Sequence, residues 1–184
     1  MPSDLRDLLR REFRWTDPDP AGGYLVSDRS GWWREPRLLN GLGAALAEQF
    51  REERPTVVVS PEVTGFLVGP LVARALGIGF VEAYKMGIVG GRRPIAEPMT
   101  WADVPADHRG EPQRLGVRSR HVGPGDRVLV VDDWAVTGAQ VRALYAVVTA
   151  LGATPVGTAV IVSECAGPVA EELRIRGLVT GADL

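Results

Sequence analysis

Apolar side chains recur along this chain at two spacings, each typical of one kind of secondary structure. Across residues 36–53 the spacing is three and four, which places the side chains on one face of a helix: Leu38, Leu39, Leu42, Leu46 and Phe50. Residues 56–60, with the sequence TVVVS, form a β-branched run that is too short for a helix. This run predicts a buried strand.

The alternation of strand and helix continues toward the C-terminus. Further elements are predicted at residues 66–77 (helix), 79–84 (strand), 127–131 (strand), 141–151 (helix) and 156–162 (strand). Gly77 and Gly152 would end the two helices, and Pro70 is tolerated in the first of them if it lies in or near the first turn. Repeated strand–helix–strand units predict an α/β fold with a mostly parallel central sheet flanked by helices.

Residues 86–125 interrupt this regularity. The segment is rich in glycine, proline and charge and has no sustained periodicity. Loops of about 40 residues inside a compact domain are usually functional rather than simple connections. We therefore expect residues 86–125 to form a long flexible lid loop over a site.

Composition narrows the class of protein. A chain of 184 residues suits a single domain, here residues 1–184, and a net charge of −2 predicts neither a nucleic-acid partner nor a membrane surface. Cys165 is the single cysteine and there are only two histidines, which excludes an internal disulfide and a thiolate zinc site. The N-terminal segment is charged and no apolar run reaches membrane-spanning length, so a cytoplasmic location is expected.

The stretch RVLVVDDWAVTGAQ, residues 127–140, carries the clearest chemistry. Two adjacent carboxylates, Asp132 and Asp133, follow a predicted buried strand, and a small-residue loop precedes the next helix. Backbone N–H groups at the start of a helix can bind a phosphate, while carboxylates accept hydrogen bonds from vicinal hydroxyls or help to hold Mg²⁺. A sugar phosphate offers both features. The alternative is that the two acids merely end a strand and cap a helix.

A second loop, PEVTG at residues 61–65, also follows a predicted parallel strand. Ligands of parallel sheets bind outside the carboxyl ends of the strands, so the two loops can face one ligand. A P-loop is excluded because neither loop has the Gly-Lys-[Ser/Thr] ending, and no G-x-G-x-x-G fingerprint is present.

VLVVDDWAVTGAQ resembles the signature with which type I phosphoribosyltransferases bind 5-phosphoribosyl-1-pyrophosphate (PRPP). VVVSPEVTGFLVGPLVARALGIGFVEAYK is similar to the pyrophosphate-loop segment of adenine phosphoribosyltransferases, the subgroup that the chain resembles most. GYLVSD resembles the base-binding hood segment of that subgroup, and LGVRSRHVGPGDRVLVVDD aligns in register. The resemblance covers most of residues 3–165.

The resemblance implies a single domain with a small N-terminal hood (about residues 1–35) and the lid named above. It also implies a function: transfer of the 5-phosphoribosyl group from PRPP to a purine or purine-like base, adenine by default, with release of pyrophosphate. Mg²⁺ would accompany the pyrophosphate, with no protein ligand firmly assigned, and the protein would be a homodimer.

The resemblance assigns a part of the ligand to each matching segment. Asp132 and Asp133, the acid pair, would contact the ribose hydroxyls of PRPP and act in catalysis. The phosphate loop would bind the 5′-phosphate and comprises Ala135, Val136, Thr137, Gly138, Ala139 and Gln140. The pyrophosphate loop, which would bind the pyrophosphate with the help of the Lys85 cation, comprises Glu62, Val63, Thr64 and Gly65. Two hood residues, Val26 and Ser27, would lie beside the base.

The chain departs from the family pattern at several of these positions. The family's Ser-Arg-Gly in the pyrophosphate loop is Val63-Thr64-Gly65 here, and its Arg-Lys pair is Tyr84-Lys85, so two cations are lost. In the lid, Glu-Tyr-Gly is replaced by residues 108–110, His-Arg-Gly. Two interpretations remain: a working transferase in which Arg92, Arg93 or Arg109 replaces the lost cations, or a PRPP- or nucleotide-binding regulatory protein with little or no turnover.

The hood carries an adjacent pair of tryptophans, Trp32 and Trp33. Their rings could stack on a planar base. The favoured alternative is that they fill the core of the hood or a dimer interface.

Overall fold

The computed structural model describes residues 3–19, 21–86, 97–105 and 113–184. Its central sheet has the strand order β5-β6-β4-β3-β7-β8-β9. The strands are β3 (Val57–Pro61), β4 (Gly79–Met86), β5 (Met99–Val104), β6 (Gln113–Arg118), β7 (Arg127–Ala135), β8 (Thr154–Ser163) and β9 (Ile175–Val179). From β4 to β9 all neighbouring strands are parallel, and β6 and β5 extend the β4 edge in antiparallel fashion. The predicted mostly parallel α/β fold is confirmed.

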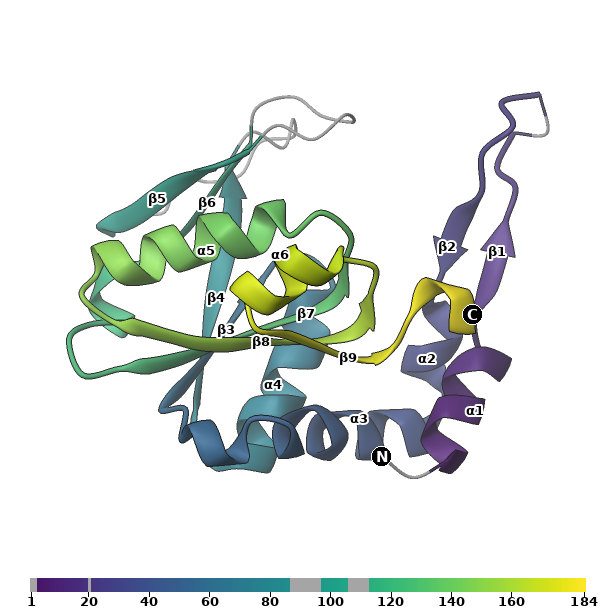
Figure 1. Cartoon of the computed structure of the whole chain (residues 1–184), viewed down its shortest axis with the longest axis horizontal. Helices are drawn as coiled ribbons and strands as arrows, with labels where there is room; N and C mark the ends of the chain where they lie inside the picture. Colours follow the sequence, from purple (N-terminus) through teal and green to yellow (C-terminus); the bar gives the residue numbers. More distant parts are fainter. Residues whose placement is uncertain (1–2, 20, 87–96, 106–112) are drawn as a thin grey trace.

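Helices cover both faces of this sheet (Figure 1). The helices are α1 (Ser3–Arg11), α2 (Ser30–Arg34), α3 (Pro36–Glu48), α4 (Gly65–Leu76), α5 (Ala139–Ala150) and α6 (Gly167–Glu172). Figure 1 shows α5 and α6 on one face and α3 and α4 on the other, with α1 packed against α3. Among the described residues, no helix has the length and apolar content that a bilayer crossing requires.

The hood contains a small antiparallel hairpin of β1 (Arg14–Thr16) and β2 (Val26–Asp28), in which Trp15 lies opposite Ser27. In Figure 1 this hairpin stands apart from the central sheet, close to the C-terminus of the chain. A two-stranded hairpin is marginal by itself. It is anchored through α1 and α2, which pack on α3.

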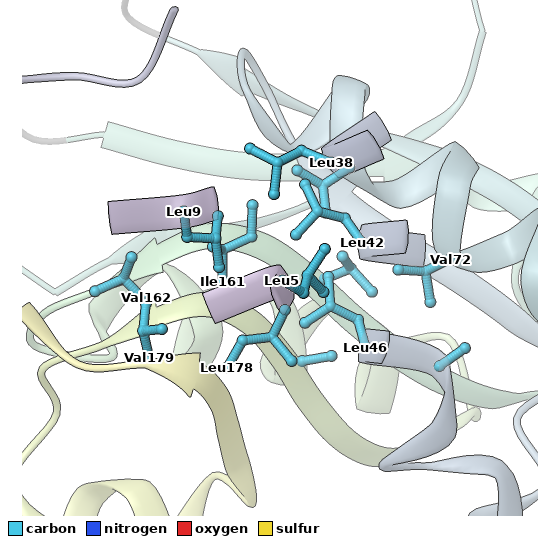
Figure 2. Packing of buried hydrophobic residues seen from close by; sticks show 14 of the residues in the cluster. Leu5, Leu9, Leu38, Leu42, Leu46, Val72, Ile161, Val162, Leu178 and Val179 are labelled. Carbon is cyan, nitrogen blue, oxygen red and sulfur yellow. The ribbon is translucent and has the colours of Figure 1, made fainter. Parts of the chain in front are cut away.

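The largest hydrophobic cluster joins the hood to the sheet. Figure 2 shows leucines of α1 and α3 meeting branched residues of β8 and β9. Trp32 belongs to this cluster: its ring is fully buried and its Nε1–H donates to the Leu9 carbonyl at 2.9 Å. Trp33 packs against the same cluster. The tryptophan pair therefore fills the core, as favoured, and base stacking by Trp32 is excluded.

One predicted helix end is wrong. The helix predicted over 36–53 ends at Glu48, and a separate 3-10 turn, Arg51–Glu53, follows. Phe50 nevertheless keeps the apolar pattern because its ring is fully buried. Pro70 is the sixth residue of α4, so it lies beyond the first turn. Burial of one face of α4 by α3 and by strands β3 and β7 holds the helix together around it.

The lid prediction for 86–125 is wrong in part. Two stretches of it, Met99–Val104 and Gln113–Arg118, are strands β5 and β6, and β4 continues to Met86. In β6, QRLGVR, apolar and polar residues alternate over only a few positions, and only Leu115 and Val117 bury their side chains on one face. The period-2 pattern that predicts a strand is therefore weak in this sequence. Residues 87–96 and 106–112 lie outside the described residues, as do Arg92, Arg93, His108 and Arg109.

Candidate active site

A cavity of about 910 Å³ opens at the carboxyl edge of the sheet. Ten of the residues proposed from the sequence line it: Val26, Ser27, Glu62, Val63, Thr64, Lys85, Asp132, Asp133, Val136 and Gln140. They come from the hood, from the ends of β3, β4 and β7, and from the start of α5. The fold thus brings four separate predicted segments to one cavity.

The acid pair lies within β7, which runs on to Ala135 rather than ending at residue 131 as expected. Both carboxylates are buried, with 8% and 6% of Asp132 and Asp133 exposed. The Asp133 N–H donates to Asp132 Oδ1 at 2.9 Å. Burial, together with the negative charge of Asp133, raises the pKa of Asp132 well above its ordinary value. A buried acid pair of this kind favours ligands that can donate hydrogen bonds to it.

Arg29 of the hood reaches across the cavity to the acid pair. Its guanidinium forms an ion pair and hydrogen bond with Asp133 Oδ2. The same guanidinium lies 6.0 Å from the centre of the Trp134 ring. The described residues that line the cavity include two cations, Arg29 and Lys85.

The phosphate loop connects β7 to α5. Gly138 has a φ of +74°, and a Cβ atom on it would lie 2.7 Å from Leu173 and 2.9 Å from Val169, so a larger residue would be strained here and would displace these side chains. The first N–H groups of α5 have no carbonyl partner inside the helix, although Ala139 N–H donates to Thr137 Oγ1 at 3.3 Å. This helix start can accept an anion.

Gln140 stands in the first turn of α5 and lines the cavity. Its Oε1 atom is buried and accepts no hydrogen bond from any described residue. Buried polar atoms are normally paired. This amide oxygen can therefore accept a hydrogen bond from a donor group of a ligand bound in the cavity.

The pyrophosphate loop connects β3 to α4 and is tied to β4 by backbone contacts. Glu62 N–H donates to the Ala83 carbonyl at 2.9 Å, and Lys85 N–H donates to Glu62 Oε1 at 2.6 Å. The Glu62–Val63 peptide bond is cis, and Val63 is 70% exposed. The Glu62 carboxylate thus holds the ends of β3 and β4 together, a role that its sequence position did not indicate.

Six cavity residues were missed by the sequence reasoning: Trp15, Tyr24, Leu25, Arg29, Trp134 and Glu164. Trp134 packs edge-on against Trp15, with ring centres 6.1 Å apart, and its Nε1–H donates to Glu164 Oε2 at 2.8 Å. Glu164 directly follows β8, so the rule that ligands gather at the carboxyl edge could have found it. Trp15 had no such signal, because its place depends on the β1–β2 pairing.

Tyr84, which stands where the family has an arginine, has a cation beside it. The Arg118 guanidinium lies 4.9 Å from the centre of the Tyr84 ring and donates to its hydroxyl at 3.1 Å. Lys85, the next residue along β4, lines the cavity whereas Tyr84 does not. Arg118 does not line the cavity either, so among the described residues the positive charge of the cavity comes from Lys85 and Arg29.

The donor atoms present fit Mg²⁺ only as a companion of a phosphorylated ligand. The described residues include no group of three or more acidic, histidine or cysteine side chains that could enclose a metal ion. Mg²⁺ is commonly held by substrate phosphates together with one or two carboxylates rather than by a protein cage. Pyrophosphate oxygens would supply most of its ligands here.

The fold and this cavity define the class of protein. The model of the phosphoribosyl transferase domain matches residues 34–175, more than half of the chain, so the protein belongs to the phosphoribosyltransferase family, with the type I fold. Enzymes of this class are pentosyltransferases. The curated relatives that the chain matches include adenine phosphoribosyltransferases. The one from Yersinia pestis strain Pestoides F is 34% identical over 149 residues, which cover 80% of this chain and 75% of that protein.

Solved structures give the same picture of the fold. The adenine phosphoribosyltransferase of Leishmania tarentolae is 25% identical, with a TM-score of 0.78 over 98% of this chain and 88% of that one. The enzyme from Rhodothermus marinus is 24% identical, with a TM-score of 0.78 over 97% and 99% of the two chains. The Trypanosoma brucei enzyme, solved in complex with AMP, pyrophosphate and ribose-5-phosphate, is 21% identical, with a TM-score of 0.78 over 100% and 82%.

Proposed function

We propose that this protein transfers the 5-phosphoribosyl group from PRPP to a purine or purine-like base, with adenine as the first candidate, and releases pyrophosphate. The observation that carries the proposal is the convergence of the acid pair, the phosphate loop and the pyrophosphate loop on one cavity beneath the hood. Adenine comes from the names of the relatives. We also propose that it acts in purine salvage and that it does so in the cytoplasm.

In this proposal, each part of PRPP binds to a different part of the cavity. The carboxylates of Asp132 and Asp133 would accept hydrogen bonds from the ribose hydroxyls, and the phosphate loop with the start of α5 would bind the 5′-phosphate. The pyrophosphate loop and Lys85 would bind the pyrophosphate. Val26 and Ser27 of β2 would lie beside the base.

In the reaction, the bond between C1′ and the pyrophosphate oxygen breaks, and a base nitrogen forms the new bond to C1′. The proton that this nitrogen loses is balanced by protonation of the released pyrophosphate. Positive charge develops on the ribose ring in an oxocarbenium-like transition state. The buried acid pair lies where it can stabilise that charge, and the surrounding loops fix both reactants in line. Mg²⁺ bound to the pyrophosphate would supply neutralisation of the leaving group's charge.

A second candidate is a regulatory protein that binds PRPP or a nucleotide and turns over little or none. Two positions favour it, because Thr64 and Tyr84 stand where the family has arginines. Lys85 and Arg29 are the cations among the described residues that line the cavity. Both candidates require the ribose-phosphate site and differ only in the chemical step.

The test combines binding with turnover. PRPP binding is measured by calorimetry, and AMP or pyrophosphate formation is measured with PRPP, Mg²⁺ and a panel of bases that includes adenine. We expect PRPP to bind and one base to be converted. Binding without conversion of any base would favour the regulatory candidate.

Variants of the acid pair assign the ribose site. Changing both Asp132 and Asp133 to Asn is expected to weaken PRPP binding by about tenfold or more, since charge-assisted hydrogen bonds contribute roughly 1.5–3 kcal/mol each. Asp103→Asn is the matched control, because its side chain is 86% exposed on the edge strand β5. Unchanged PRPP affinity in the double variant would refute the assignment.

A further inference from the structure

Arg29 joins two parts of the site that are distant in the sequence. It lies directly after β2, in the hood, whereas its partner Asp133 belongs to β7, 104 residues further along the chain. The Asp133 side chain is 8% exposed and that of Arg29 is 28% exposed. A pair this well shielded keeps more of its electrostatic strength than a surface ion pair.

The carboxylate that Arg29 contacts is one of the two proposed to bind ribose. Its Oδ2 atom accepts from Arg29, so the direction of the Asp133 carboxylate is set from the hood. The guanidinium is in turn held near the Trp134 ring, and that indole is fixed by its hydrogen bond to Glu164. These contacts leave Arg29 little freedom to turn away from Asp133.

The charges that line the cavity indicate how the ion pair between Arg29 and Asp133 could help PRPP to bind. Among the described residues, four acidic residues line the cavity, Glu62, Asp132, Asp133 and Glu164, against two cations, Arg29 and Lys85. PRPP carries several negative charges of its own. A cation beside the acid pair reduces the repulsion that the ribose phosphate meets on entry.

We propose that Arg29 is a positioning residue for PRPP: it orients the Asp133 carboxylate toward the ribose hydroxyls and ties the hood to the sheet edge. The inference rests on the proposed function. The base-binding side of the hood and the ribose-binding acids are thereby held in one arrangement.

The experiment is a double-mutant cycle read out by calorimetry with PRPP. The proteins are the wild type, Arg29→Gln, Arg29→Lys, Asp133→Asn and the Arg29→Gln/Asp133→Asn double variant. Arg10→Gln is the control, because Arg10 also forms a hydrogen-bonded ion pair with an aspartate, Asp183, at 2.8 Å but does not line the cavity. Melting temperatures are recorded for every variant.

We expect Arg29→Gln to raise the Kd for PRPP by about tenfold or more, and Arg29→Lys to recover most of the affinity, since it keeps the charge but not the fork. The double variant should bind PRPP about as well as Asp133→Asn alone, because Arg29 acts through that carboxylate. Arg10→Gln should leave the Kd within about twofold. If turnover is present, Arg29→Gln should raise KM for PRPP more than it lowers kcat.

Other outcomes overturn the inference. A purely structural role predicts that Arg29→Gln lowers the melting temperature and leaves the Kd for PRPP unchanged. Independent effects of the two substitutions, multiplying in the double variant, would also refute action through Asp133. If Arg29→Gln does not fold, Arg29→Lys and the double variant, which removes both partners, still decide the question. A wild-type protein that binds no PRPP would overturn the proposed function and this inference together, whereas tight PRPP binding by Arg29→Gln would overturn the inference alone.

Discussion

Adjacent carboxylates in a buried strand cost folding free energy, and their retention in β7 marks a position where stability and ligand binding conflict. Asp132 is shielded from water and faces the charge of Asp133, so its charged form is disfavoured. The neighbouring cations, Arg29 on Asp133 and Lys85 nearby, offset part of this cost. A hydroxyl-bearing ligand that donates to both acids would offset more.

This conflict predicts the pH dependence of stability. The pKa of Asp132 is higher in the folded state than its ordinary value of 3.8, so the folded protein binds this proton more tightly than the unfolded chain does. The stabilisation that comes from proton binding by Asp132 in the folded state is complete below about pH 3.8, and it is lost as pH rises through the raised pKa. The amide of Asp132→Asn does not ionise, so the free energy of unfolding of this variant does not fall in the same way as pH rises. The variant should therefore be more stable than the wild type at neutral pH, while it binds PRPP more weakly.

Urea denaturation between pH 4 and pH 8 measures the effect. The stability difference between Asp132→Asn and the wild type should grow with pH. Asp103→Asn, on the exposed edge strand, should differ from the wild type by no more than about 0.5 kcal/mol at any pH. A difference that shrinks with rising pH would contradict the assigned direction.

Gly138 offers a second test at the scale of one residue. Its φ of +74° opposes any larger residue, and so do Leu173 and Val169, whose side chains lie within 3 Å of the place that a Cβ atom would take. Gly138→Ala should lower the free energy of unfolding by about 1–3 kcal/mol and weaken binding of AMP, since the phosphate loop must shift. Gly123→Ala is the control, because it has open space and no positive φ. Equal stability of the two variants would show that the loop tolerates the change.

At the scale of the element, the start of α4 defines the pyrophosphate loop. Gly65 lets the first turn lie close to β3, where a Cβ would come within 3.0 Å of Ser60 and 3.1 Å of Pro61. Thr64 precedes this turn and makes no side-chain cap bond to it. The backbone of the loop is therefore closely packed at Gly65, whereas the side chain of Thr64 can be replaced without the loss of a helix cap.

Thr64→Arg should accordingly tighten binding of PRPP and of pyrophosphate, by about threefold to tenfold, at little cost in stability. The added guanidinium restores a cation where the family pattern has one. Thr64→Gln, of similar length but without charge, should leave both affinities near those of the wild type. Calorimetry with each ligand at two salt concentrations tests the charge dependence. Weaker binding by Thr64→Arg would show that Arg29 and Lys85 already occupy the space or supply the charge.

At the scale of the whole molecule, the parallel order β4-β3-β7-β8-β9 decides which loops meet. The loops after β3 and β7 come from neighbouring strands, so the pyrophosphate loop and the acid pair lie side by side. The hood then closes the cavity through α1 and α2, which share the leucine-rich cluster of α3 (Figure 2). Stability of the hood and geometry of the site are therefore linked through one core.

Homodimerisation stays a prediction at this scale. It rests on the resemblance to the family, and light scattering should give a mass of twice the 19.8 kDa of one chain. The measurement belongs at the protein concentration used for the activity assay, with a dilution series to detect dissociation. A single-chain mass throughout the series would contradict it.

The sequence predicted most of the parallel sheet because its strands are buried on both faces. Runs such as those around Val58 and Val130 consist of branched apolar residues, and the helices between them show clear one-sided periodicity. Strand β5 at the sheet edge was missed because its residues are only partly buried, and its neighbour β6 was missed because only its three central residues are buried. The hood hairpin was missed because its three-residue strands are too short to show a period.

The site divides in the same way. The sequence by itself determined the acid pair, the two loops and the fold class. Each of these depends on a contiguous run of residues, so the residue types and their spacing are enough to predict it. Only the tertiary structure decided that Arg29 meets Asp133, that Trp15 and Trp134 wall the cavity while Trp32 fills the core, and that Glu62 binds the backbone of β4. The hood contacts depend on the packing of the hood on the sheet, and the Glu62 contact depends on the pairing of β3 with β4.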